Sequence, residues 1–136
     1  MNIWRKSINI NTKERVEFID ITSKVENFVN SLDIDTGLVN IFNRHSTAGL
    51  LINENEKGLI NDFKKLLERI VPVDGNYEHN RIDNNADSHQ RSVLLDSSKT
   101  LQVVNGKLDL GTWQRIFFVE LDGPRTRTVN IMVVGE

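Results

Sequence analysis

The chain has 136 residues, a formal net charge of −2 and a hydrophobic content of 38%, which is the composition of an ordinary globular protein. This length suits one domain over residues 1–136, and the near-neutral charge disfavours a nonspecific nucleic-acid binder, which needs a basic surface. The absence of cysteine excludes disulfides, thiolate metal sites and a cysteine nucleophile, so pH-sensitive or imidazole–metal chemistry depends on the three histidines.

The start of the chain shows no apolar segment of the kind found in signal peptides. No apolar run approaches the roughly 20 residues needed to span a bilayer. We therefore expect a cytoplasmic protein that does not contact a membrane.

The first half of the chain predicts four strands and two helices. In chain order these are strands at 3–10 and 14–21, a helix from Thr22 or Ser23, strands at 38–42 and 50–52, and a helix at 56–70. Ser23 and Glu26 have the spacing of a capping box, in which a hydroxyl and a carboxylate satisfy free amides. The second helix should bury one apolar face, which comprises Leu59, Phe63, Leu66, Leu67 and Ile70.

The second half of the chain opens with a polar segment at 73–87, which has no periodicity and is therefore mobile or functional. A short helix at 89–95 follows. The expected strands are 100–104, 107–110, 114–121 and 128–134, with a type I′ turn at Asn105-Gly106. This order predicts an α+β fold in which two main helices cover mostly antiparallel sheets.

The first candidate for chemistry is the segment Arg44-His-Ser-Thr-Ala-Gly-Leu50, which follows a predicted strand. His45 lies beside Ser46 and Thr47, whose hydroxyls can donate to a phosphate or a carboxylate. Asn53 and Glu54 then precede a helix, whose free amides attract an anion. The simpler interpretation is that these polar residues cap the helix.

The other two histidines lie in polar segments, His79 after Tyr77-Glu78 and His89 after Asp87-Ser88. Each histidine alone would simply be solvated. Together with His45 they predict a shared site for a divalent ion such as Mg²⁺ or Zn²⁺, although their spacing matches no metal motif.

Two further segments carry candidate residues. Gln114 follows Trp113 at the start of a predicted strand, where Trp113 forms either a pocket wall or, as we favour, part of the core. Arg125 follows a turn and can contact a phosphate or pair with Asp122. The sequence contains no Walker A, GxGxxG or GxSxG motif, which argues against P-loop, dinucleotide-binding and α/β-hydrolase proteins.

These segments resemble the YjbQ family, whose members are often described as secondary thiamine-phosphate synthases. The resemblance runs through nearly the whole chain. It rests on His45-Ser-Thr-Ala-Gly-Leu50 with Asn53-Glu-Asn55, Val71-Pro72 with Tyr77-Glu-His79, Ser88-His89, Gly111-Thr-Trp-Gln114, and Asp122-Gly-Pro-Arg125. The chain departs from the family pattern at Arg91, where a lysine is usual, and at Asp96, where a glycine is common.

The resemblance implies a β-sandwich-like homotrimer with a pocket in or between subunits. It also implies weak synthesis of thiamine phosphate from hydroxymethylpyrimidine diphosphate and thiazole phosphate, with release of pyrophosphate. We expect catalytic roles for His45, Glu54, His89 and Gln114, contacts to a small phosphorylated substrate from Ser46, Thr47, Asn53, Arg91 and Arg125, and metal ligation by His45, His79 and His89. The alternatives are a metal-dependent hydrolase and a non-catalytic trimer that binds a phosphorylated metabolite.

Overall fold

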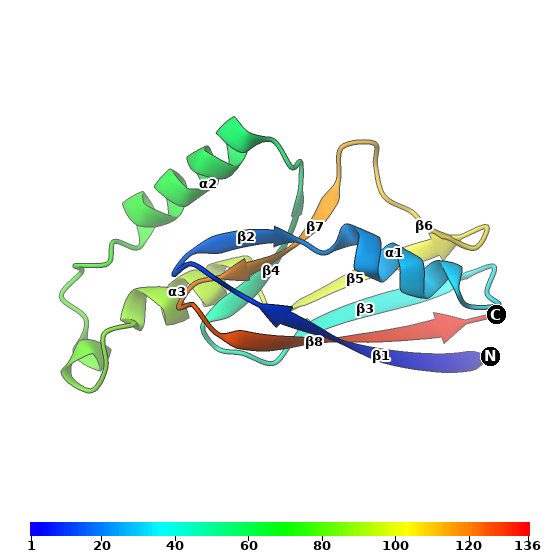
Figure 1. Cartoon of the computed structure of the whole chain (residues 1–136), viewed down its shortest axis with the longest axis horizontal. Helices are drawn as coiled ribbons and strands as arrows, with labels where there is room; N and C mark the ends of the chain where they lie inside the picture. Colours follow the sequence, from blue (N-terminus) through cyan, green and yellow to red (C-terminus); the bar gives the residue numbers. More distant parts are fainter.

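Eight strands form two antiparallel sheets, with three α-helices and one short 3₁₀ helix beside them (Figure 1). The computed structural model describes all 136 residues. The elements are β1 (Asn2–Asn11), β2 (Glu17–Asp20), α1 (Thr22–Asn30), β3 (Gly37–Asn43), β4 (Ala48–Asn53), α2 (Lys57–Ile70), η1 (Glu78–Arg81), α3 (Ala86–Leu95), β5 (Ser98–Val104), β6 (Lys107–Leu108), β7 (Arg115–Glu120) and β8 (Thr126–Gly135). No helix has the length and apolar character needed to cross a membrane.

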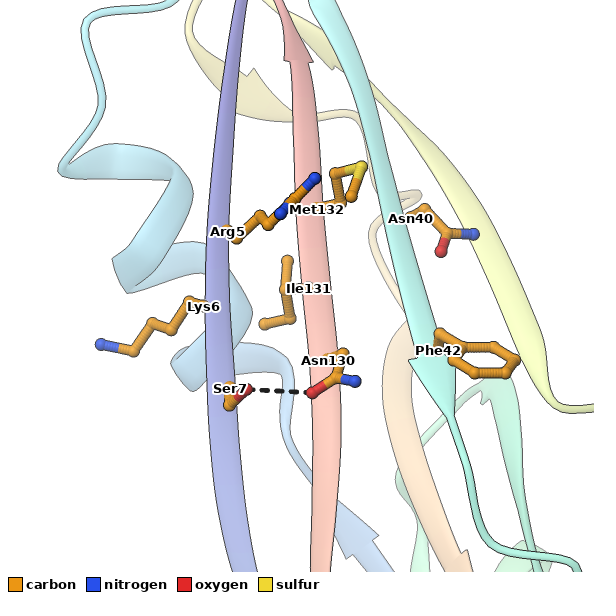
Figure 2. A pocket seen from close by; sticks show the side chains of 8 residues that line it. All are labelled: Arg5, Lys6, Ser7, Asn40, Phe42, Asn130, Ile131 and Met132. Carbon is orange, nitrogen blue, oxygen red and sulfur yellow. Dashed lines mark hydrogen bonds between the residues drawn. The ribbon is translucent and has the colours of Figure 1, made fainter.

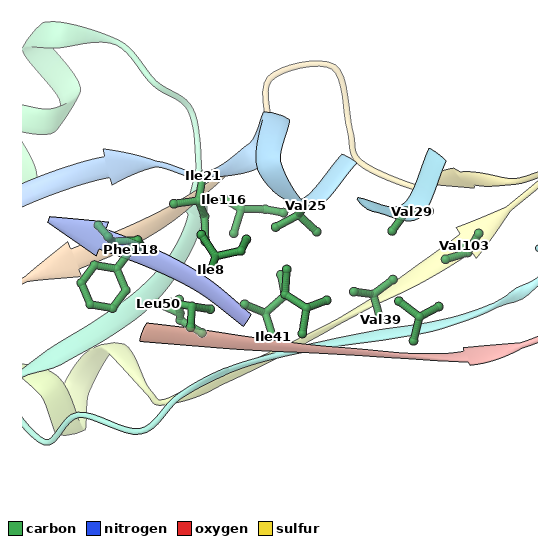
Figure 3. Close-up of a cluster of buried hydrophobic side chains, with 14 of the residues drawn as sticks. Ile8, Ile21, Val25, Val29, Val39, Ile41, Leu50, Val103, Ile116 and Phe118 are labelled. Carbon is green, nitrogen blue, oxygen red and sulfur yellow. The ribbon is translucent and has the colours of Figure 1, made fainter. Parts of the chain in front are cut away.

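The larger sheet has the strand order β1-β8-β3-β5-β6, so the last strand of the chain lies inside it and pairs with both β1 and β3. One face of this sheet packs against α1. Figure 3 shows Val25 and Val29 of α1 above Val39 and Ile41 of β3, and all four side chains are buried. The opposite face of the sheet is free of other elements of this chain.

The smaller sheet has the strand order β2-β7-β4, and its central strand is buried on both faces. Ile116 and Phe118 point into the main core, while Phe117 and Val119 join a second cluster with Leu67 of α2. Alternate side chains of a strand point to opposite faces, so a strand covered on both sides needs apolar residues throughout. The run Ile116-Phe-Phe-Val119 meets that need.

The predicted fold class is confirmed, and so is the turn at Asn105-Gly106, where φ is 53° and 79°. The predicted capping box is wrong. The helix α1 begins at Thr22, whose backbone N–H donates to Asp20 Oδ1 at 2.9 Å, and Ser23 makes no capping bond. Asp20 is therefore the side chain that satisfies the start of this helix.

The predicted buried face of α2 is only partly buried. Leu67 is buried, whereas Leu66 is 40% exposed and Ile70 is 56% exposed. Glu56 caps the helix by accepting from the amides of Gly58 and Leu59, at 2.6 and 2.9 Å. The third helix, α3, begins three residues earlier than predicted.

Candidate functional site

The predicted site residues lie at opposite ends of the β4–β7 strand pair. The register pairs Ala48 with Glu120 at one end and Asn53 with Arg115 at the other. At about 3.3 Å per residue, these ends are roughly 17 Å apart along the strands. We call them the histidine end (residues 43–47 and 120–125, with η1 and the start of α3) and the Gln114 end (residues 53–55 and 111–115).

At the Gln114 end, the predicted residues stabilise local turns. Gln114 Oε1 accepts from the amide of Gly111 at 2.9 Å, and Asn53 Oδ1 accepts from the amide of Glu54 at 2.8 Å. Gln114 and Asn53 are exposed, and Glu54 is half-buried. Trp113 is 71% exposed, so the prediction that it belongs to the core is wrong.

An ion pair that the sequence did not indicate closes the Gln114 end. Arg115 Nε donates to Asp20 Oδ2 at 2.7 Å, and Asn55 Nδ2 donates to the same oxygen at 3.1 Å. Partial burial raises the pKa of Asp20, but the hydrogen bonds from Arg115, Thr22 and Asn55 together outweigh it and leave that pKa below its usual value. The pair ties β2, β7 and the segment after β4 together.

At the histidine end, the side chain of His45 accepts a hydrogen bond from an amide of β8 that β3 no longer reaches. Pairing between β3 and β8 stops at Asn43 and Val129. Beyond that point the amide of Thr128 donates to His45 Nε2 at 3.0 Å. Asn43 holds the bend, because its Oδ1 accepts from the amide of His45 at 2.9 Å. Ser46, next along the bend, is exposed and has no hydrogen bond within the chain.

The surroundings of His45 favour the neutral form of its imidazole. Partial burial is the main cause that lowers the pKa of His45, and the nearby cation of Arg127 lowers it further. The hydrogen bond from Thr128 fits this state, because only an unprotonated ring nitrogen can accept.

Behind His45 lies a buried ion pair between Arg127 and Glu120. Arg127 Nε donates to Glu120 Oε1 at 2.8 Å, and Thr12 Oγ1 donates to the same oxygen at 2.8 Å. Arg127 Nη2 donates to Thr47 Oγ1 at 2.9 Å, so this predicted substrate-binding hydroxyl is instead part of the ion-pair network. A glutamate at the end of the apolar run of β7 is the sequence signal for this network.

Arg91 is only 2% exposed, which argues against the predicted phosphate contact within a single chain. Its Nε and Nη2 donate to the carbonyl of Val71 at 3.1 and 2.9 Å, and its Nη1 lies 3.7 Å from Asp87 Oδ2. Arg15 binds the same buried carboxylate through two hydrogen bonds of 3.0 Å. The spacing of Asp87 and Arg91 on one helix face is the signal that predicts such a pair.

His79 and His89 do meet. Their ring centroids are 4.9 Å apart in an edge-to-face arrangement, with His79 on η1 and His89 on α3. His79 Nε2 lies 3.0 Å from Asn85 Oδ1, and Asn85 Nδ2 donates to Asp122 Oδ2 at 2.8 Å. Arg125 completes the chain of contacts by donating from Nη2 to Asp122 Oδ2 at 3.0 Å.

The carboxylate of Asp122 stays ionised in this setting. Burial raises its pKa, but the hydrogen bonds from Asn85 and Arg125 outweigh that effect and leave the pKa below its usual value. The alternative interpretation of Arg125, a salt bridge to Asp122, is therefore the contact that forms. The side chain of Arg125 remains 51% exposed.

Two adjoining cavities lie along η1 and share three lining residues, Asn76, Tyr77 and Glu78. One, of about 540 Å³, is also lined by His79, Ala86, His89 and Gln90. The other, of about 470 Å³, is also lined by Asn80 and Arg81. Arg81 is exposed and forms no ion pair, so its guanidinium is free to contact an anion.

The three histidines do not form the predicted metal site within one chain. No three His, Cys, Asp or Glu side chains lie where they can bind one ion together. Structural and catalytic zinc sites generally use three or four protein ligands. The residues of a single chain therefore do not fit a resident zinc ion.

The chain was compared with known proteins. The family described as UPF0047 protein YjbQ-like matches residues 6–136. A UPF0047 protein of Methanothermobacter thermautotrophicus is 52% identical over 136 residues, covering 100% of this chain and 95% of the relative. The UPF0047 protein YugU of Bacillus subtilis is 38% identical, covering 96% of this chain and 98% of the relative.

Solved structures give the same match. A crystal structure from Sulfolobus solfataricus, described as a YbjQ-like protein of unknown function, has a TM-score of 0.97 with 38% identity and covers 99% of each chain. A YjbQ/UPF0047 family protein from Clostridium acetobutylicum has a TM-score of 0.90 with 36% identity and covers 95% of this chain and 99% of its own.

Proposed function

The chain belongs to the YjbQ-like UPF0047 family, and we propose that it is a small transferase of the secondary thiamine-phosphate synthase type. The observation that carries this proposal is the pair of adjoining cavities along η1. A reaction between two heterocyclic substrates needs two neighbouring sites, one for each ring. The ring of Tyr77 lines both cavities and offers a stacking surface to either substrate.

In this reaction the bond between the pyrimidine methylene carbon and the diphosphate oxygen breaks. Pyrophosphate leaves with the electron pair, and the thiazole nitrogen forms the new bond to that carbon. The protein must hold the two rings in line and stabilise the negative charge that grows on the diphosphate. Arg81 lines one cavity and is our candidate for the second task, and the half-exposed Arg125 of the sequence motifs is another.

His79 and His89 fit a different part of the same site. Both line the larger cavity, where they can accept or donate a proton at a substrate ring nitrogen or amine. Magnesium usually binds through substrate phosphates with few protein ligands. A magnesium ion would therefore enter with the diphosphate, with Glu78 as the acidic residue of the cavity lining.

We also propose that the chain forms a homotrimer through the free face of the five-stranded sheet. Figure 2 shows Arg5, Asn40, Phe42 and Met132 side by side on this face, which is hollowed by a cavity of about 520 Å³. Exposed apolar residues on the same strands support an interface; they are Ile3, Leu38, Phe42 and Met132.

The trimer is tested by measuring the mass in solution, with sedimentation or light scattering. The wild type should have the mass of three chains, and Phe42→Asp should release monomers because it places a charge in the apolar contact. Ile82→Asp is the matched control, since Ile82 is 87% exposed and lies away from this sheet. A monomeric wild type at high protein concentration would contradict the trimer.

The synthase is tested by incubating the purified protein with hydroxymethylpyrimidine diphosphate, thiazole phosphate and Mg²⁺, and measuring thiamine phosphate. We expect slow turnover by the wild type and a loss of at least about tenfold in Arg81→Gln, because one charged contact to the diphosphate is removed. Arg69→Gln removes an exposed arginine from α2 and should leave the rate unchanged. No turnover with saturable binding of either precursor would favour the non-catalytic binding protein instead.

A further inference from the structure

The hydrogen bonds around His45 fix which of its ring nitrogens carries the proton. Neutral imidazole has one N–H and one nitrogen with a free lone pair. The amide of Thr128 donates to His45 Nε2 at 3.0 Å, so Nε2 holds the lone pair. The proton of neutral His45 is therefore on Nδ1.

The contacts around His79 fix the opposite arrangement. The carboxylate of Asp122 can only accept, and it already accepts from Arg125. The atom of Asn85 that lies 2.8 Å from Asp122 must therefore be the amide nitrogen. The oxygen of Asn85 then faces His79 Nε2 at 3.0 Å, so Nε2 must donate and Nδ1 keeps the lone pair.

We propose that Asn85 is a positioning residue that presents the Nδ1 atom of His79 as a hydrogen-bond acceptor at the larger cavity, while His45 has the opposite tautomer and can only donate. This role deepens the proposed function. An accepting nitrogen suits a substrate group that carries a proton, such as the exocyclic amine of an aminopyrimidine. A donating Nδ1–H on His45 suits an anionic oxygen.

The burial of Asn85 supports a positioning role. Asn85 is only 6% exposed, so water does not compete for its two hydrogen bonds. Asn85 occupies the N-cap position of α3 but makes no capping bond. The amide of Ala86 is instead satisfied by Asn80 Oδ1 at 3.1 Å. The side chain of Asn85 is thus used for His79 and Asp122 and is not needed to cap the helix.

The tautomers can be read from the ring nitrogens by two-bond ¹H–¹⁵N NMR on the substrate-free protein, at a pH where the rings are neutral. The chain has only three histidines, so His45→Gln and His89→Gln assign every signal. We expect the proton on Nδ1 of His45 and on Nε2 of His79. His89, whose ring forms no hydrogen bond within the chain, should exchange between both forms. A proton on Nδ1 of His79, or on Nε2 of His45, overturns the proposal.

Two variants then test the part played by Asn85. In Asn85→Ala the tautomer ratio of His79 should fall about fivefold, as expected for the loss of one ordinary hydrogen bond. Asn84→Ala, at the exposed neighbouring position, should leave the ratio unchanged. Asp122→Asn keeps the side-chain shape but lets the Asn85 amide group rotate by half a turn and exchange its oxygen and nitrogen. This variant should therefore shift the tautomer ratio of His79 even if Asn85→Ala does not fold. An unchanged ratio in a folded Asn85→Ala or in Asp122→Asn contradicts the proposal.

The NMR measurement needs no substrate, so its result separates from that of the synthase assay. Fixed tautomers without thiamine phosphate formation would leave the role of Asn85 intact and reject the proposed reaction. Turnover with freely exchanging tautomers would support the proposed reaction and reject the role of Asn85.

Discussion

The two ends of the β4–β7 pair differ in how their polar residues are held. At the histidine end, Glu120 and Arg127 form an ion pair that is almost fully buried. At the Gln114 end, Arg115 and Asp20 form a pair that water still reaches, with side chains 39% and 17% exposed. A buried charge depends on its partner far more than an exposed one does. The histidine end should therefore depend on its ion pair more strongly than the Gln114 end does.

The same comparison separates structural residues from candidate functional ones. Thr47 and Arg91 lie in conspicuous motifs but are buried and hydrogen-bonded within the fold. Arg81, which belongs to no motif that the sequence singled out, is exposed and unpaired beside a cavity. A polar residue that is both buried and fully hydrogen-bonded within the fold has no group left to offer a substrate, so exposed residues with free donors or acceptors are the better candidates.

The largest expected effect is at the buried ion pair. Glu120→Gln leaves Arg127 buried without its counter-ion, and we expect a loss of about 3–5 kcal/mol in the free energy of unfolding. Urea denaturation followed by circular dichroism measures this loss. A change below about 1 kcal/mol would mean that the two ends do not differ in the way described.

A smaller effect is expected from His45, and it depends on pH. The folded-state pKa of His45 is lowered, so the unfolded chain binds a proton first as the pH falls. Stability from this group is therefore present above the unfolded pKa of about 6.5 and is lost as the pH falls towards the folded value. In His45→Gln, the free energy of unfolding should fall less steeply as the pH is lowered below 7. His89→Gln should keep the pH dependence of the wild type.

The partly exposed ion pair at the Gln114 end should contribute less. Asp20→Asn removes the charge that Arg115 contacts but keeps an oxygen that can accept from the amide of Thr22. We expect a loss of at most about 1 kcal/mol, reduced further by salt. Denaturation at low and high ionic strength checks both parts of this expectation.

The smallest effect is expected at Gln114 itself. Gln114→Ala removes one exposed hydrogen bond to the amide of Gly111, so the stability should change by less than about 0.5 kcal/mol. If thiamine phosphate synthesis nevertheless falls tenfold or more, Gln114 takes part in a site that a single chain does not complete. Unchanged synthesis would leave it as a turn residue.

Local patterns in the sequence predicted the elements well. The apolar run from Ile116 to Val119 indicated a buried strand, and Asn105-Gly106 indicated a tight hairpin turn; both are present. These features depend on neighbours within a few residues. The limits of α1 were less predictable, because the side chain that satisfies its start is Asp20, on the preceding strand, rather than Ser23.

The candidate site was less predictable, because it depends on contacts between distant segments. Nothing local shows that Asn53 and His45 lie at opposite ends of one strand pair, since that follows from the length and register of β4 and β7. The pairing of His79 with His89 likewise arises where η1 meets α3. Motif content alone grouped residues that the fold keeps apart.

The order of the strands in the larger sheet also bears on how the chain is made. The strand β8 is synthesised after all the others, yet it is the one that joins β1 to β3. Until it leaves the ribosome, β1 has no partner strand and exposes an unpaired edge together with Ile8 and Ile10. Such edges pair readily with other chains. The period before β8 emerges should therefore be when this chain most needs protection by chaperones.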